Sequence, residues 1–326
     1  MPVVADMTEF RDRRGGLVGF GILQIVIGLI CALFVLVLAA ALELTSRRGI
    51  APPANIAPAF VIYGAAAFYF ITVGTGSIRT RRWARAMSVA FSASWLAVGI
   101  AIVLSSFIFL RRTLVFVRPS ETMLVVSLTA AILIIAFIVL PLALFLFYRR
   151  DDVRQTCEAA DPVIRWTDRV PWPVLAIATL LGFMSFATLA NVGAPVVPFF
   201  GMALTGASAA LTMLTMSGLF GFLTVQWIVM RKSAWWTTLM LHIIGAVVAM
   251  ATLVSGDVGE VYAKMNVPRE QIEAMQLDTL GRSPALWFVM LLVWTAYLLV
   301  LLRTRHYFDT PAPRTRATDA ARVAVA

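Results

Sequence analysis

The segment RRDDVRQTCEAADPVIRWTDRVPWP, residues 149–173, interrupts a chain that is otherwise strongly apolar. It is the densest cluster of charged residues in the sequence, and long apolar runs stand on both sides of it. An apolar run of about 20 residues is long enough to cross a bilayer as a helix. The segment therefore predicts a membrane protein with two halves, residues 17–148 and 173–303, joined by a polar loop, residues 149–172.

The composition of the whole chain agrees with this reading. Of its 326 residues, 60% are hydrophobic and only 13% are charged, whereas ordinary globular domains have about 25% charged residues. A soluble fold with so few charges lacks the polar surface to cover itself. The net charge of +10 does not indicate nucleic-acid binding, because Lys and Arg gather at the ends of the apolar runs and form no aromatic-interleaved face.

Eight runs are long enough to span a membrane: 17–44, 56–77, 84–110, 122–148, 173–190, 199–230, 234–255 and 284–302. The predicted fold class is an all-α polytopic bundle of about eight transmembrane helices, forming one transmembrane domain over residues 17–306. The run 199–230 is too long for one straight crossing. We expect either that its first turns lie outside the membrane or that the helix is broken near residues 201–206. Four spans in each half also fit a parallel repeat.

The positions of the cations predict the orientation. Most of the 27 Lys and Arg residues fall in segments on the same side as residues 1–16. The positive-inside rule places that side in the cytoplasm, and an even number of spans returns the chain to it. We therefore expect both termini to be cytoplasmic. Residues 307–326 are rich in Pro, Arg, Thr and Ala without an apolar period, so we expect a disordered tail.

The central loop carries most of the polar chemistry. Asp151 and Asp152 are predicted to cap a short helix over 153–159, and the Asp161-Pro162 pair is a second helix-start signal. One interpretation is two interfacial helices with a hinge. The other is a cytoplasmic site that docks a protein or binds an anionic ligand, built from Cys157, Glu158, Asp161, Arg165, Trp166, Asp168 and Arg169.

The stretch from Thr156 to Leu175 fits the pattern TCExxDPxxRWTDRxPxPVL. In this it resembles a cytoplasmic loop of uncharacterised bacterial multi-pass inner-membrane proteins. The resemblance covers about twenty residues and implies a location in a bacterial inner membrane. It implies no activity, because none is known for those proteins.

Charged residues are confined to the ends of the eight runs, which disfavours a proton pump, a voltage-gated channel or an intramembrane protease. The candidate intramembrane polar or packing residues are Gln24, Gly206, Gln226 and His242. We expect His242 to make one hydrogen bond to a neighbouring helix. The Gly/Thr-rich sixth run, which contains Gly206, is interpreted either as the central packing helix or as a broken helix lining a substrate path.

The sequence offers no paired acids, zinc ligand set or activated nucleophile, so we assign no catalytic, cofactor-binding or metal-binding residues. The outer segment 256–283, with a short helix expected after Pro268, is a second candidate partner surface. Three functions stay open. The favoured one is a non-catalytic membrane component that docks a protein through the central loop. The alternatives are a permease for a neutral or lipid-like solute, with its path along the sixth run, and a lipid- or isoprenoid-modifying enzyme.

Overall fold

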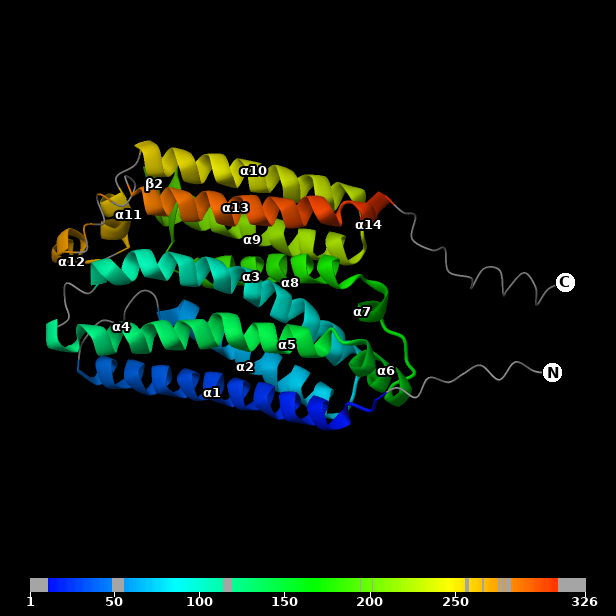
Figure 1. The fold of residues 1–326 in the computed structure, drawn as a ribbon. Coiled ribbons are helices and arrows are strands. Elements are labelled where there is room, and N and C mark those ends of the chain that lie inside the picture. The colour runs from blue at the N-terminus through cyan, green and yellow to red at the C-terminus, as the bar shows by residue number, and fades with distance from the viewer. Residues whose placement is uncertain are drawn as a thin grey trace, which may run out of the picture.

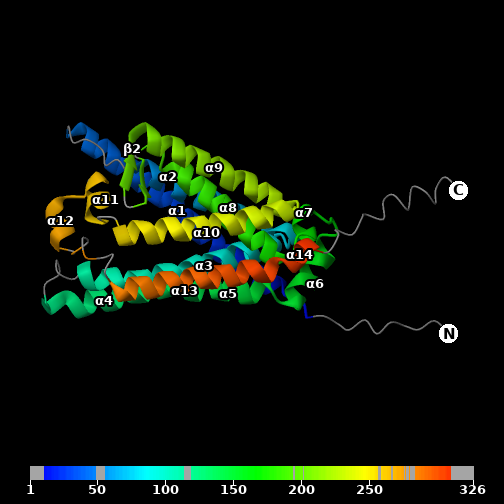
Figure 2. The same ribbon diagram turned by 90° about the horizontal axis from the view of Figure 1, so that it is seen from above.

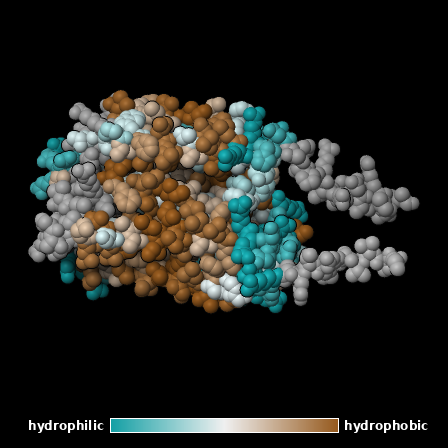
Figure 3. Space-filling view, in the orientation of Figure 1, coloured by the Kyte–Doolittle hydropathy of each residue, from teal (hydrophilic) through white to brown (hydrophobic). Residues whose placement is uncertain are grey.

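The computed structural model describes residues 11–48, 56–113, 119–193, 195–200, 202–255, 258–265, 267–274, 276, 279 and 283–309. Within these residues, eight helices are long and apolar enough to cross a membrane. They run side by side along one direction (Figure 1). A broad hydrophobic belt covers the middle of the molecule, with hydrophilic surface toward its ends (Figure 3). The predicted all-α polytopic bundle is confirmed.

Seven of the spans are single α-helices: α1 (Arg14–Arg47), α2 (Ile56–Ile78), α3 (Arg82–Thr113), α8 (Trp172–Ala190), α9 (Gly206–Ile228), α10 (Lys232–Ser255) and α13 (Pro284–Thr304). The fourth span is α4 (Pro119–Ile134) continued by α5 (Leu140–Tyr148), with a π-helical turn at Ile135–Val139 between them. That turn brings the Phe137 carbonyl oxygen against Gly99 of α3, where a side chain would collide with it.

The start of α1 and the end of α13 lie at the same end of the bundle (Figure 1). That end also carries α6 (Asp151–Ala160), α7 (Trp166–Arg169) and α14 (His306–Asp309), and we call it the polar end. The helix α14 occupies part of the segment predicted as a disordered tail from residue 307 onward. The rest of that tail, and most of the segment 1–16, lie outside the described residues.

The most extensive helix packing is between α1 and α2. A Cβ added at Gly21 would lie 2.8 Å from the Gly74 carbonyl oxygen, and one added at Gly74 would lie 2.7 Å from the Gly21 carbonyl oxygen. About two helical turns further along α1, a Cβ added at Gly28 would lie 3.1 Å from the Ala67 carbonyl oxygen. Small residues at such contacts let two helix backbones touch inside a membrane, where dispersion replaces the hydrophobic effect as the packing force.

The sixth run begins outside a helix. Residues Val196–Phe199 (β1) pair antiparallel with Met202–Thr205 (β2), with Val196 opposite Thr205, and α9 starts only at Gly206. Gly206 has φ +62° and no neighbour within 4 Å of an added Cβ. The prediction that Gly206 is a close-packing residue is therefore wrong. Its role is to adopt a positive φ, which other residues reach only at a steric cost.

The central helix of the bundle is α3, which packs against α2, α5, α8 and α13. The sixth span, α9, packs mainly along α8, and leaves Leu211, Phe222 and Val225 exposed toward the lipid. The interpretation of the sixth run as the central packing helix is therefore wrong. Because α3 contacts spans from before and after the central loop, the two halves share one core.

At the opposite end, the outer segment forms two short helices, α11 (Val258–Lys264) and α12 (Arg269–Ala274) (Figure 1). The helix α12 follows Pro268 as predicted, while α11 was not predicted. Several residues of the segment 256–283, including Gly281, lie outside the described residues, so its role as a partner surface stays a prediction.

Candidate functional site

The central loop folds back onto the polar end of the bundle. Its first helix, α6, begins at Asp151 and buries Val153, Thr156 and Cys157 against the bundle. Its second helix, α7, begins at Trp166. The backbone N–H of the preceding residue, Arg165, donates a hydrogen bond to the Asp168 carboxylate at 2.9 Å. The predicted start at Pro162 is wrong. Asp161 precedes a proline and stays extended (φ −130°, ψ 90°), so its carboxylate caps no helix of the central loop and binds arginines instead.

One arginine gathers the three acids that the sequence had singled out. Arg82, the first residue of α3, places Nε 3.3 Å from Asp168 Oδ1 and Nη2 3.4 Å from Glu158 Oε1. Its backbone N–H donates to Asp161 Oδ2 at 3.3 Å. Sequence reasoning missed Arg82, because a cation at the end of a span is expected for orientation alone. Its position in the Arg-rich turn before α3 was the only local signal.

Asp161 is the most enclosed of these acids, with 1% of its surface exposed. Burial raises the pKa of this carboxyl, but the Arg165 hydrogen bond at 2.6 Å and the backbone N–H of Arg82 outweigh burial, so the net pKa is lowered. Its Oδ1 lies 3.7 Å from Arg81 Nη1, which is an ion pair without a hydrogen bond. Asp161 is thus an anchor inside the fold and is closed to a partner.

A second set of contacts ties α6 to the start of α1. Arg13 Nε lies 2.6 Å from Asp152 Oδ2, and the Arg13 backbone N–H donates to the Thr156 hydroxyl at 3.1 Å. Hydrogen bonds from Arg150 and Arg13 lower the pKa of Asp152 to about 2. The central loop is therefore clamped from two sides, by α1 through Asp152 and by α3 through Arg82.

Cys157 lies on the buried face of α6, with 1% of its surface exposed, in a cluster with Leu17, Leu144 and Tyr148. Burial raises the pKa of its thiol to about 11. At neutral pH the thiol is protonated, and a protonated thiol is a poor nucleophile. The structure gives Cys157 a packing role.

Other residues of the central loop point outward. Val163, Ile164 and Trp166 have 56%, 59% and 51% of their surface exposed, and Arg169 is exposed as well. Trp166 and Arg169 are three apart on α7 and therefore share a face. The predicted site residues thus divide into an inward set (Cys157, Glu158, Asp161 and Asp168), an outward set (Trp166 and Arg169), and Arg165, whose guanidinium binds Asp161 at the boundary.

Inside the membrane, Gln24 belongs to a buried polar network at the junction of four helices. Its Nε2 donates to the Ser88 hydroxyl at 3.1 Å, and the Tyr148 hydroxyl donates to its Oε1 at 3.4 Å. The Tyr148 and Ser77 hydroxyls are 2.6 Å apart, and the Ser77 hydroxyl oxygen lies 3.0 Å from the Leu17 carbonyl oxygen. The network joins α1, α2, α3 and α5. Each polar side chain of the network has a hydrogen-bond partner, so we assign the network a structural role in holding the four helices together.

His242 and Gln226 lie apart from this network. His242 Nε2 is 3.1 Å from the Trp294 carbonyl oxygen, and its ring packs on Trp294 and Tyr297. This is the single interhelical hydrogen bond expected from the sequence. Gln226 is partly exposed on α9 and belongs to neither group of contacts.

In the described part of the chain, no group of three or more His, Cys, Asp or Glu residues is placed to hold a metal ion. Comparison of the chain with protein-family models, with curated proteins and with solved structures finds no match. The functional argument therefore begins from the geometry of the polar end.

Proposed function

We propose that this multi-pass membrane protein lies in a bacterial inner membrane and holds a cytoplasmic protein on its polar end. One observation carries the proposal. Three large apolar side chains, Val163, Ile164 and Trp166, are more than half exposed within an otherwise charged surface. Exposed apolar groups of this kind, rimmed by polar residues, mark interaction sites. We call residues 162–166 together with Arg169 the docking edge.

The place of the docking edge favours a protein over a lipid as its partner. The connection between α6 and α7 forms the outermost part of the polar end, beyond the ends of the long helices, in both ribbon views (Figures 1 and 2). Side chains at that distance from the hydrophobic belt face the aqueous phase. A lipid contact would lie instead at the level of Trp172, where α8 begins.

The chemistry of the docking edge indicates what the partner presents. Trp and Arg are the residue types most often found at the centre of protein interfaces, and both stand on one face of α7. Arg169 lies beside the apolar residues, whereas the charge of Arg165 is already paired with Asp161. The complementary surface is therefore apolar at its centre and acidic opposite Arg169. The clamps through Arg82 and Asp152 hold the edge in shape before binding, which reduces the ordering cost of association.

The orientation is testable by thiol labelling. In a Cys31→Ala background, Val163→Cys is expected to react with a membrane-impermeant maleimide only after permeabilisation, because position 163 is exposed and the positive-inside rule assigns the polar end to the cytoplasm. The same background without the new cysteine is the control. Its Cys157 should be labelled slowly both before and after permeabilisation, because the thiol is buried and its pKa is about 11. Labelling of Val163→Cys in intact cells would reverse the orientation.

Docking is testable by quantitative affinity purification in mild detergent. The wild-type protein is expected to recover a protein in stoichiometric amount, and Ile164→Ala combined with Trp166→Ala should reduce the recovery at least about tenfold, because central interface residues each contribute about 2 kcal/mol or more. Val229→Ala is the matched control, since Val229 and Ile164 are both 59% exposed. Absence of a stoichiometric protein from the wild type, or equal recovery by all three proteins, would refute docking at this edge.

A further inference from the structure

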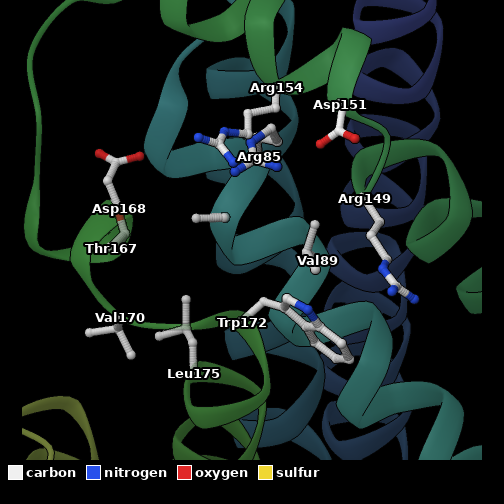
Figure 4. Close-up of a pocket in the computed structure, with 11 residues that line it drawn as sticks. Arg85, Val89, Arg149, Asp151, Arg154, Thr167, Asp168, Val170, Trp172 and Leu175 are labelled. Carbon is white, nitrogen blue, oxygen red and sulfur yellow. The ribbon is translucent and has the colours of Figure 1, made fainter. Parts of the chain in front are cut away.

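A cavity of about 280 Å³ opens between α3, α6, α7 and α8 at the polar end. In Figure 4, Arg85 and Arg154 lie along the upper side of the view, with Thr167 and Asp168 at the left and Arg149 and Trp172 toward the right. Arg85 lies one turn into α3, and Arg149 directly follows α5. The cavity is therefore at the boundary between the hydrophobic belt and the water, which is the level of lipid phosphates.

Two of the three arginines that line the cavity have no carboxylate partner in the described part of the chain. Arg85 donates to the Tyr148 carbonyl oxygen at 3.3 Å, which is a neutral acceptor. The Arg149 guanidinium stacks over the ring of Trp172, 5.5 Å from its centroid. Only Arg154 is paired, with Glu158 at 2.9 Å. Glu158 and Asp168 act on Arg85 only from beyond ion-pair distance, so its guanidinium keeps free N–H groups for a closer anion.

The acids that line the cavity do not neutralise it. The carboxylate of Asp168 is bound by Arg82 at 3.3 Å, from outside the cavity. Asp151 stands in the first turn of α6, where the positive end of the helix dipole offsets a negative charge. The lining therefore holds more positive than negative charge.

We propose that this cavity binds a phosphate group, with Arg85 and Arg149 supplying the charge. The planar guanidinium matches the oxygen geometry of phosphate and can bond it through two N–H groups. The phosphate has two possible sources, the headgroup of an anionic phospholipid and a soluble phosphate compound. The site is separate from the docking edge, and its occupancy does not depend on a protein partner.

The test measures binding to the purified full-length protein in mild detergent. The probes are dioleoylphosphatidylglycerol, dioleoylglycerol as the same acyl chains without phosphate, and inorganic phosphate against chloride at equal ionic strength. Phosphatidylglycerol or inorganic phosphate is expected to bind and raise the Tm, and dioleoylglycerol is not. The double variant Arg85→Gln with Arg149→Gln should bind at least about tenfold more weakly. Arg79→Gln with Arg231→Gln, two exposed arginines at the polar end, is the control and should bind as the wild type does.

The Tm of each variant without ligand separates a loss of binding from a loss of folding. Competition identifies the source: inorganic phosphate displaces phosphatidylglycerol if the site takes soluble phosphate, and fails to do so if it takes the lipid. The proposal is overturned if dioleoylglycerol stabilises equally, if the control pair loses binding as the Arg85 and Arg149 pair does, or if a folded Arg85 and Arg149 double variant binds as the wild type does.

Discussion

Gly21→Leu is expected to lower the free energy of unfolding by about 3 kcal/mol or more. A side chain there meets the Gly74 carbonyl oxygen at 2.8 Å and the Ile78 backbone nitrogen at 3.1 Å. Backbone atoms of a packed helix cannot rotate away as a flexible side chain does, so α1 has to move off α2. Unfolding by increasing SDS in mixed micelles measures the loss directly.

Gly19→Leu is the matched control for this prediction. It introduces the same side chain into the same helix two residues earlier, where no atom lies within 4 Å of the added Cβ. Its effect should stay within about 0.5 kcal/mol. If the two variants unfold alike, the close contact between α1 and α2 is not a source of stability.

Arg82→Met is expected to release the central loop from the bundle, at a cost of about 3 kcal/mol. The loss leaves the Asp168 side chain, 8% exposed, without its counter-ion, and removes the second arginine on Glu158. Proteinase K digestion should then cut within residues 149–172 much faster than in the wild type. Arg79→Met, three residues earlier on an exposed side chain, should leave the cleavage rate unchanged.

A double-mutant cycle isolates the ion pair in this second prediction. If Arg82 acts through Asp168, then Asp168→Asn should cost little once Arg82 is already Met, so the two effects fall short of additivity by about 1 kcal/mol or more. Fully additive effects would mean that Arg82 stabilises the loop without acting through that carboxylate.

The membrane spans were predictable from the sequence because their signal is local. A run such as 17–44 is apolar over its whole length, and α1 covers it with a few residues to spare. The length of the run 199–230 also indicated a break near residues 201–206, and α9 does start at Gly206. The hairpin before it was not predictable, since nothing nearby in the sequence shows that residues 196–199 pair with residues 202–205. The central position of α3 was not predictable either. Small residues in a span indicate that another helix packs closely against it, but they do not indicate which helix.

The candidate site was predicted in part. Its acids were identified from the charged loop, but their common partner was not, because Arg82 lies 76 residues from Glu158 and 86 from Asp168 in the chain. The cavity was missed for the same reason. Its arginines were interpreted one at a time, as orientation signals or as members of helix-face pairs. Only the fold shows that Arg85 and Arg149 line the same cavity and that neither forms an ion pair with a carboxylate of the described residues.

The network around Gln24 can be completed only after the fourth span has been synthesised. Gln24 and Tyr148 are 124 residues apart, and a chain made from its N-terminus delivers α1, α2 and α3 to the translocon before α5 exists. Until the fourth span leaves the ribosome, the Ser77 hydroxyl and the Gln24 carbonyl oxygen lack their tyrosine partner within the lipid. The first three spans are therefore an incomplete nascent intermediate, and the arrival of Tyr148, directly ahead of the central loop, completes the network in the N-terminal part of the bundle.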